Sequence, residues 1–269
     1  MTAAEPIALV HAAPDPAGLN AAWGESVGPP VAIDGQSGGN GAGPIALLCW
    51  NVWIGRGRLR EMIERIRDGD YAQQGFPAGT HVVALIQEAY RGGDDVPAHP
   101  RPRSAPRTVL RGGEEDVVGV ARELELWLRF APSMRNGRHR SDRGNAILAT
   151  MPIAEAEAVV LPFSYQRRVA LCAAVDLPGA SGGSVRVRVC SAHLDPRGAR
   201  ALDVLGVAGR GRQIEALIRH LDRLPHSPQI VGADLNLARG TLEPAFRRLK
   251  AAGFAPGVPP TWPAWSHTY

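Results

Sequence analysis

Several apolar runs in this 269-residue chain end in acid, amide or imidazole side chains. Runs of four to eight apolar residues bounded by turn residues are typical of buried strands. Polar groups at the ends of several buried strands indicate a functional site, because a buried strand has no other use for them. In chain order, these endings are Asn51, Gln87-Glu88, His193-Leu194-Asp195 and Asp234-Leu235-Asn236.

These endings combine carboxylates and carboxamides with one histidine. Oxygen ligands suit Mg²⁺, which keeps several waters and takes one or two carboxylates plus substrate oxygens. Such a set fits a hard cation and a phosphate better than zinc or an acyl group. His193 has no second His or Cys at ligand spacing, so a zinc hydrolase is a poor interpretation.

Asp234 and Asn236 lie two residues apart after the last of these runs. In an extended segment, side chains i and i+2 face the same side, so the carboxylate and the amide are expected to converge on one point. This geometry suits orientation of a water by Asp234 and contact with phosphate or metal by Asn236. The alternative is a plain Asx turn.

Strands and helices alternate from about residue 45, and they must position these groups. Few helices separate the middle strands, which favours a mixed sheet arrangement over a doubly wound parallel sheet. Residues 91–113 are rich in Pro, Gly and Arg and are expected to form a long loop. Helices are predicted over 58–67, 116–126 and 242–251 and along the apolar stripe 214–224. Strands are predicted over 45–51, 82–87, 146–150, 158–161, 169–175, 185–191 and 229–232.

The first 43 residues differ in composition from the rest of the chain. They are rich in Ala, Gly and Pro and show no sustained periodicity. Such a segment buries little apolar area. We therefore expect residues 1–43 to be a flexible extension and residues 44–269 to form the catalytic domain.

The overall composition of the chain excludes few classes of function. Arg and Lys total 30 against 26 acids, a net charge of +4, which is compatible with an anionic substrate without requiring one. The three cysteines lie in apolar runs without metal-ligand spacing, so they are expected to be small buried residues in a reducing compartment. No transmembrane run and no secretory signal is visible, and a cytoplasmic monomer is the expectation.

In their order and spacing, these motifs resemble those of the endonuclease/exonuclease/phosphatase superfamily. These proteins are metal-dependent phosphohydrolases related to pancreatic deoxyribonuclease, sphingomyelinases and inositol polyphosphate 5-phosphatases. Each motif alone is weak, but five in the right order, from about Ile45 to the C-terminus, make a strong signal: the four endings above and the strand Gly144-Asn145-Ala146-Ile147-Leu148. The resemblance implies an α/β (α+β) fold, a four-layer sandwich of two packed mixed β-sheets flanked by helices, with the site at one edge.

The resemblance also implies roles for individual residues. Glu88 would be the direct carboxylate ligand of Mg²⁺, or of Mn²⁺, and Asn51 would help to hold the metal or the phosphate. His193, Asp234 and Asn236 would be catalytic, with Asp234 orienting the attacking water. The alternative for Asn145 is a structural role, as an amide hydrogen-bonded within a strand. The alternative for Arg168 is an exposed charge at the rim of the site. The residues expected to contact the substrate phosphate are Asn145, Arg168, His193 and Asn236.

One motif implied by the resemblance is not found. It is an Asp-His pair that enters a final core strand, whereas this chain ends at Trp265-Ser266-His267-Thr268-Tyr269. No apolar strand follows His267, so that role is not given to it. The C-terminal strand is thus expected to be missing, either because the sequence is an incomplete product, which we favour, or because the chain is a degenerate member.

The leading hypothesis is a Mg²⁺-dependent hydrolase of phosphate esters that uses in-line attack by water. It could be a phosphodiesterase, a nuclease or a phosphatase. The alternative is a catalytically impaired phosphoester-binding module on the same fold. The substrate stays open among nucleic acid, phosphoinositide and other phosphodiesters. The Arg-rich segments 101–111 and 135–143 are equally consistent with a nucleic-acid-binding face and with solvated loops.

Overall fold

Ten strands and five α-helices make up the described part of the chain, residues 4–36, 43–179, 183–198, 203 and 205–257 of a computed structural model. One sheet contains β1 (Ala8–His11), β7 (Ile153–Val160), β8 (Val169–Pro178), β9 (Ser184–His193) and β10 (Gln229–Asp234), in that order. The other contains β2 (Val31–Ile33), β5 (Trp127–Arg135), β6 (Ser141–Ala149), β4 (His81–Gly92) and β3 (Ile45–Asn51). The helices are α1 (Leu19–Gly24), α2 (Leu59–Asp68), α3 (Val117–Glu123), α4 (Val207–Leu221) and α5 (Pro244–Ala251).

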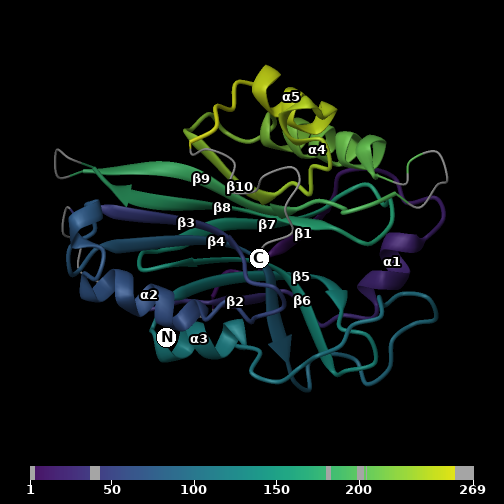
Figure 1. Cartoon of the computed structure of the whole chain (residues 1–269), viewed down its shortest axis with the longest axis horizontal. Helices are drawn as coiled ribbons and strands as arrows, with labels where there is room; N and C mark the ends of the chain where they lie inside the picture. The colour runs from purple at the N-terminus through teal and green to yellow at the C-terminus, as the bar shows by residue number, and fades with distance from the viewer. Residues whose placement is uncertain (1–3, 37–42, 180–182, 199–202, 204, 258–269) are drawn as a thin grey trace.

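The two sheets stack on each other, and helices cover their outer faces. In Figure 1, α4 and α5 lie over the β1–β10 sheet, and α2 and α3 lie under the β2–β3 sheet. Both sheets are mixed: β3 runs parallel to β4 and β9 parallel to β10, while β8 is antiparallel to β9. The predicted fold class is therefore confirmed. Among the described helices, none combines the length and the apolar character needed to cross a bilayer.

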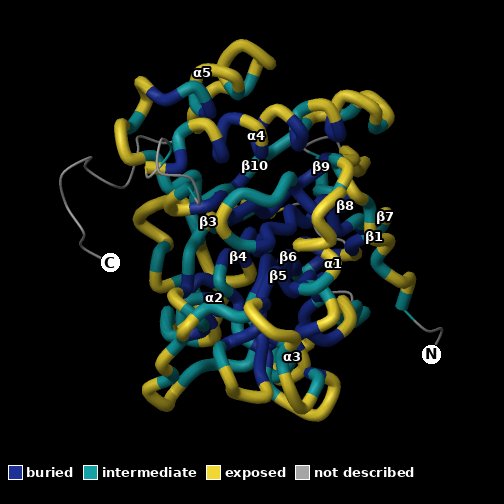
Figure 2. Tube along the Cα trace, turned by 90° about the vertical axis from the view of Figure 1, so that its right-hand side faces the viewer, coloured by how far each residue is buried: buried dark blue, intermediate teal, exposed yellow. Residues whose placement is uncertain are grey.

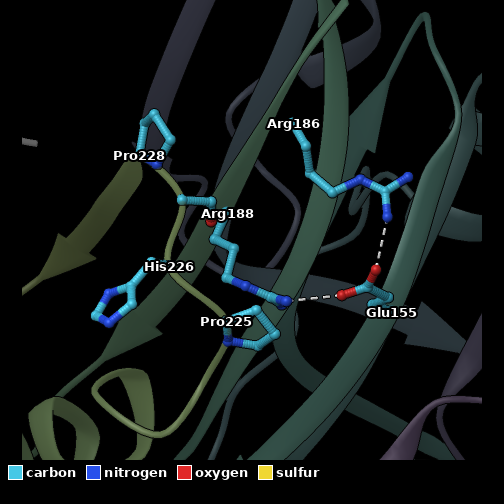
Figure 3. A pocket seen from close by; sticks show the side chains of 7 residues that line it. Glu155, Arg186, Arg188, Pro225, His226 and Pro228 are labelled. Carbon is cyan, nitrogen blue, oxygen red and sulfur yellow. Dashed lines mark hydrogen bonds and ion pairs between the residues drawn. The ribbon is translucent and has the colours of Figure 1, made fainter.

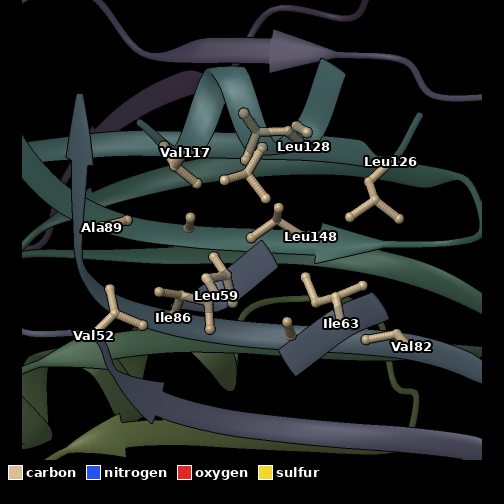
Figure 4. Packing of buried hydrophobic residues seen from close by; sticks show 14 of the residues in the cluster. Val52, Leu59, Ile63, Val82, Ile86, Ala89, Val117, Leu126, Leu128 and Leu148 are labelled. Carbon is tan, nitrogen blue, oxygen red and sulfur yellow. The ribbon is translucent and has the colours of Figure 1, made fainter. Parts of the chain in front are cut away.

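Alternation of side chains along the strands divides the core into three layers. Leu85, Leu171 and Val189 fill the space between the sheets. On β4, the neighbouring positions Ala84 and Ile86 instead face α2 and α3 (Figure 4). The third layer lies between the β1–β10 sheet and the helices α4 and α5. Because both faces of the central strands are covered, their trace is almost continuously buried in Figure 2.

The N-terminal segment belongs to the fold. β1 pairs with β7 and β2 pairs with β5, each at the edge of a sheet, and Trp23 of α1 packs edge-on against Phe163. The expectation of a flexible extension is therefore wrong for residues 4–36. Strands of four and three residues and a helix of six are too short to show a periodicity. They are held by pairing with distant strands, which a local pattern does not reveal.

Two other expectations also fail. Strand β5 was not predicted, because Arg129 and Arg135 interrupt its apolar pattern. Both arginines are buried, and each donates hydrogen bonds to backbone carbonyls of other segments, for example Arg129 to Ile153 and Arg135 to Ala98. Cys49 is exposed, whereas Cys172 and Cys190 are buried as expected. Its strand β3 is an edge strand in the described part of the sheet, so its inward face is not fully covered.

The ends of β3, β4, β9 and β10 meet at one edge of the sandwich. The two parallel pairs point the same way, with β4 over β9 and β3 over β10. The sheets approach closely here because Gly232 of β10 has no side chain. A Cβ at this position would lie 2.7 Å from Leu85 Cδ1 and 3.1 Å from Cys49 Sγ. The polar side chains that follow these strands are thus brought to one place.

The close approach at Gly232 is testable by overpacking. We expect Gly232→Ala to lower the free energy of unfolding by about 1–3 kcal/mol, because the added methyl group meets the buried Leu85. Urea denaturation measures this change. Gly183→Ala is the matched control, since nothing lies within 4 Å of its added Cβ, and it should change stability by less than about 0.5 kcal/mol. Equal effects of the two variants would contradict the tight packing.

Candidate active site

A β-bulge in β4 directs Glu88 into the space between the sheets. Ile86 pairs with Ala146 and Ala89 with Gly144, so β4 carries one extra residue at this point. Ile86 and Ala89 both pack in the core facing α2 and α3. Without the bulge, Glu88 would share the helix-covered face of Ile86. With it, and with a φ of 54°, its carboxylate comes within 4.0 Å of the Nδ1 of His193 on the opposite sheet.

Gln87 joins the two sheets beside this carboxylate. Its Nε2 donates to Ser191 Oγ on β9 at 3.1 Å and to Leu85 O at 3.0 Å. Ser191 Oγ in turn donates to Ile86 O at 2.9 Å. The Gln87 and Ser191 side chains are thus used in bonding between the sheets, so Gln87 supports the site.

Asn51 and Asp234 meet across the sheets at the ends of β3 and β10. Asn51 Nδ2 donates to Asp234 Oδ2 at 2.7 Å, and Asn51 Oδ1 accepts from the Trp53 N–H at 2.9 Å. The second oxygen of Asp234 accepts from the Asn236 N–H at 3.0 Å. Both oxygens of this carboxylate therefore have a fixed orientation.

His193 lies between Asp234 and Glu88. Its Nε2 is 2.8 Å from Asn236 Nδ2 and 3.5 Å from Asp234 Oδ2. Asn236 Nδ2 also donates to Leu194 O at 2.9 Å, which identifies it as the amide donor. His193 Nε2 is then the acceptor, and the ring proton is assigned to Nδ1, on the side of Glu88.

The environment determines the protonation states of His193 and Asp234. Burial, together with the positive charges of Arg168 and Arg143, lowers the pKa of His193 to about 3, although Asp234 opposes this shift. Burial also disfavours the charge of Asp234. The nearby His193 and the hydrogen bonds from Asn51 and Asn236 outweigh that effect, so the pKa of Asp234 lies below its usual range. At neutral pH the site therefore pairs a neutral imidazole with an ionised carboxylate.

Arg168 lies beside His193 but is held by other groups. Its Nε donates to Asp195 Oδ1 at 3.1 Å and its Nη2 to Gln166 Oε1 at 2.9 Å. The other oxygen of the fully buried Asp195 accepts from the Tyr165 N–H and from Gln213 Nε2. Asp195 thus connects the loops around the site, and phosphate contact by Arg168 stays a prediction.

Asn145 lies opposite the bulge, on β6. Its Nδ2 donates to Val169 O, and its buried Oδ1 has no hydrogen-bond partner among the described residues. An amide whose N–H group is used in this way is better suited to connecting the strands than to binding phosphate oxygens. The geometry thus favours the structural alternative for Asn145, and its contact with phosphate stays a prediction.

Arg143 belongs to the site but was not among the predicted residues. Burial lowers its pKa, and its charge acts on Glu88, Arg168 and His193. Its Nη1 donates to Thr108 Oγ1 at 3.1 Å, which fixes the guanidinium beside the long loop. The only sequence signal was its position directly before Gly144-Asn145, and a lone arginine there also fits an exposed strand end.

The oxygen atoms at this edge fit a hard cation. The Glu88 carboxylate is 19% exposed and accepts no hydrogen bond from the described residues. Asn51 Oδ1 keeps one lone pair beyond its bond with Trp53. No group of three or more His, Cys, Asp and Glu side chains in the described ranges could hold a metal ion by itself. Mg²⁺ takes one or two carboxylates and otherwise water and substrate oxygens, so Glu88 with Asn51 fits it.

The expected absence of the Asp-His motif and of the final strand concerns the C-terminal end of the chain, and it stays a prediction. Residues 258–269, which include His267, lie outside the described residues. Within the described part, β10 is one of the two edge strands of its sheet.

No family model and no curated protein matches the chain. Solved structures do match. A protein described as endonuclease/exonuclease/phosphatase from Beutenbergia cavernae is 19% identical, with a TM-score of 0.46 over 72% of this chain and 48% of that one. Sphingomyelinase C from Streptomyces griseocarneus is 20% identical, with a TM-score of 0.38 over 77% and 68%. TDP2 from Caenorhabditis elegans is 14% identical, with a TM-score of 0.36 over 71% and 47%.

The expected resemblance is thus found among solved structures, at low identity. The chain spans about half the length of the Beutenbergia protein. Activity, substrate and metal are therefore inferred from the side chains of this chain.

The neutral state of His193 makes stability depend on pH. The folded pKa of about 3 lies below the unfolded value of about 6.5, so between them only the unfolded chain binds the proton. This contribution to stability is complete above about pH 6.5 and is lost as the pH falls toward 3, by up to about 1.4 kcal/mol per pH unit. In EDTA, His193→Gln should therefore flatten the pH dependence of the urea-derived unfolding free energy.

The exposed His139 provides the control for this measurement. For His139→Gln, the slope of the unfolding free energy against pH should equal that of the wild type from about pH 6.5 down to about pH 4.5. Parallel slopes for His193→Gln and the wild type would show that the fold does not exclude the proton from His193.

Proposed function

We propose that this chain is a Mg²⁺-dependent hydrolase of phosphodiesters. The observation that carries this proposal is the convergence of Glu88, His193 and Asp234, from three strands of two sheets, on one edge of the sandwich. Perturbed titratable groups, an acid that accepts no hydrogen bond from the described residues and flanking arginines form a combination suited to phosphoryl chemistry.

Glu88 and Asn51 would hold the metal ion. When bound there, Mg²⁺ would polarise a phosphoryl oxygen and stabilise the leaving oxygen. The donor atoms are all hard oxygens, which supports Mg²⁺, or Mn²⁺ in its place, over zinc.

His193 would bind a phosphoryl oxygen, whereas Asn236, expected to contact the phosphate as well, directs its amide N–H groups at His193 Nε2 and Leu194 O and would position the imidazole instead. A neutral imidazole with its proton on Nδ1 donates one hydrogen bond, and the Asn236 amide lies 2.8 Å from the other ring nitrogen. The charges of Arg143 and Arg168, both close enough to shift the pKa of His193, favour an anion at this point.

Asp234 would orient the attacking water. Its carboxylate is ionised, and Asn51 and Asn236 fix its orientation. It can accept a hydrogen bond from a water that attacks phosphorus in line with the leaving oxygen, and it can take the proton of that water as the attack proceeds. One such positioned base contributes a factor of about 10²–10⁴ to the rate. The new P–O bond forms as the bond to the leaving oxygen breaks, without a covalent enzyme intermediate.

The metal mechanism is tested on bis-p-nitrophenyl phosphate with Mg²⁺ or with EDTA. We expect turnover only with Mg²⁺, and a loss of about 10²–10⁴ in kcat for Glu88→Gln and for Asp234→Asn. Glu64→Gln, on the exposed side of α2, is the control and should leave kcat unchanged. Thermal shifts with Mg²⁺ alone separate loss of metal binding, expected for Glu88→Gln, from loss of catalysis.

Equal rates in EDTA would contradict the proposed metal dependence. A Mg²⁺-dependent thermal shift together with no turnover of any phosphodiester would instead support a phosphoester-binding module on this fold.

Two exposed aromatic residues adjoin the site. Trp53, two residues after Asn51, is 42% exposed, and Arg56 lies 4.5 Å from its ring centroid. Tyr165 is 37% exposed, and Arg197 lies 5.2 Å from its ring centroid. Trp53 follows β3, whereas Tyr165 lies before β8 in the opposite sheet. Paired aromatic and arginine side chains are a means of binding bases next to a phosphate.

The two Arg-rich segments named above lie together beside this site. Arg143 Nη1 donates to Thr108 Oγ1, and a Cβ at Gly137 would lie only 3.3 Å from Thr108 O. Arg111 of the long loop lies 5.9 Å from the Trp53 ring. Exposed arginines thus continue from the catalytic edge over this loop, which favours nucleic acid over other phosphodiesters as the substrate.

The substrate preference can be measured separately from catalysis. Trp53→Ala and Tyr165→Ala should each raise KM for a single-stranded oligonucleotide by about tenfold, because base stacking contributes about 1–3 kcal/mol. Both variants should cleave bis-p-nitrophenyl phosphate at the wild-type rate. Val109→Ala, at an 80% exposed position of the long loop, is the control. Unchanged KM values for the oligonucleotide would remove the argument for stacking while leaving the hydrolase proposal intact.

A further inference from the structure

Two cysteines face each other on neighbouring strands of the β1–β10 sheet. Cys172 of β8 pairs directly with Cys190 of the antiparallel β9, and their sulfur atoms are 3.2 Å apart. Both are free thiols in this structure. Directly paired residues of antiparallel strands have Cα atoms about 4.5–5.5 Å apart, which lies within the range of about 4.4–6.8 Å that a disulfide spans. The strand pairing thus provides a backbone geometry that a disulfide can bridge.

A β-sheet separates the third cysteine of the chain from this pair. Cys49 lies on β3 of the other sheet, and its sulfur points into the space between the sheets, 3.1 Å from where a Cβ at Gly232 would be. Cys172 and Cys190 instead belong to the apolar layer between the β1–β10 sheet and the helices α4 and α5. Among the pairings that the three cysteines allow, the fold is therefore compatible with Cys172–Cys190 and not with a link to Cys49.

Ion pairs beside the cysteines hold β9 in register with its neighbours. Arg188 precedes Cys190 by two residues and lies on the same face of β9, where its Nη2 donates to Glu155 Oε2 of β7 at 2.7 Å (Figure 3). Arg186, a further two residues along β9, donates to both carboxylate oxygens of its strand partner Asp176 on β8. Sliding of β9 along β8 would break these bonds, so the two sulfur atoms are kept opposite each other.

The surroundings of the two thiols are apolar and almost closed to solvent. Cys172 and Cys190 are 3% and 2% exposed, and they share their layer with Ala170, Ala192 and Leu217. The hydrogen bond with Cys190 and burial together raise the pKa of Cys172 well above that of a free thiol. In the folded chain the reactive thiolate is therefore disfavoured, and a small oxidant has little access to either sulfur.

We propose that Cys172 and Cys190 form a disulfide when the chain folds in the presence of a small-molecule disulfide such as oxidised glutathione. One cysteine thiolate attacks a sulfur of the small disulfide, which releases one thiol and leaves a mixed disulfide on the chain. The second cysteine thiolate attacks the chain sulfur of this mixed disulfide and releases the other thiol. The two cysteines lose two protons and two electrons, and the small disulfide takes them up. This crosslink does not depend on the proposed hydrolase activity.

The test is refolding of the full chain from urea with oxidised or with reduced glutathione, followed by alkylation of the free thiols and digestion with trypsin. Cleavage sites stand at Arg168, Arg186, Arg188 and Arg197. With oxidised glutathione, a peptide should appear in which residues 169–186 are joined to residues 189–197, and with reduced glutathione it should be absent. The oxidised chain should also unfold at a higher urea concentration than the reduced chain, because the crosslink restricts the unfolded state.

A matched control moves one thiol out of register. Cys172→Ala combined with Ala170→Cys shifts the thiol by two residues on the same face of β8, and the loop to Cys190 keeps nearly the same length. Such diagonal residues have Cα atoms about 7–8 Å apart, which is at or beyond the limit for a disulfide. This variant should refold, as checked by circular dichroism, without the joined peptide.

Cys49→Ser should form the crosslink as the wild type does. Wild-type chain that refolds in oxidised glutathione without the joined peptide, a crosslink that includes Cys49, or equal crosslinking of the out-of-register variant would each overturn the proposal.

Discussion

The candidate site depends on the close approach of the two sheets at one edge. Gly232 allows this approach, and the amides of Gln87 and Asn51 maintain it through bonds to Ser191 and Asp234. The bond between Gln87 and Ser191 is buried, and a buried donor left without a partner costs about 1–3 kcal/mol. Sliding one sheet over the other would break several of these hydrogen bonds together. The separation of Glu88 and His193, which come from different sheets, is therefore set by cross-sheet hydrogen bonds.

The charges at this edge are coupled. Arg143 and Arg168 favour an anion in the site, and the same charges, together with burial, keep His193 neutral. A bound phosphate adds negative charge beside the imidazole, and a nearby negative charge raises the pKa of a histidine. Under the proposed function, phosphate binding would therefore increase the proton affinity of His193. Arg168 has this effect only because Asp195, fixed by Tyr165 and Gln213, holds its guanidinium.

The sequence predicted the parts of the structure that repeat a local pattern or end a strand in polar residues. The apolar stripes of α2 and α4 and the central strands were found, and the ends of β3, β9 and β10 bring Asn51, His193 and Asp234 together. The N-terminal elements and β5 were missed because distant partners stabilise them: strand pairing for β1 and β2, and backbone carbonyls for the buried arginines of β5. The orientation of Glu88 could not be predicted, because one extra residue in a strand reverses the face of every residue after it.

The bulge that orients Glu88 has a counterpart in the other sheet. In β7, one extra residue between Ala154 and Glu157 gives Glu155 a φ of 50°, close to the 54° of Glu88. Positive φ is unfavourable for glutamate, so each bulge must be stabilised by what surrounds it. The carboxylate of Glu155 binds Arg186 and Arg188, whereas that of Glu88 accepts no hydrogen bond from the described residues. The same kind of bulge therefore serves an internal ion pair in one sheet, and in the other it leaves a carboxylate available to the proposed metal ion.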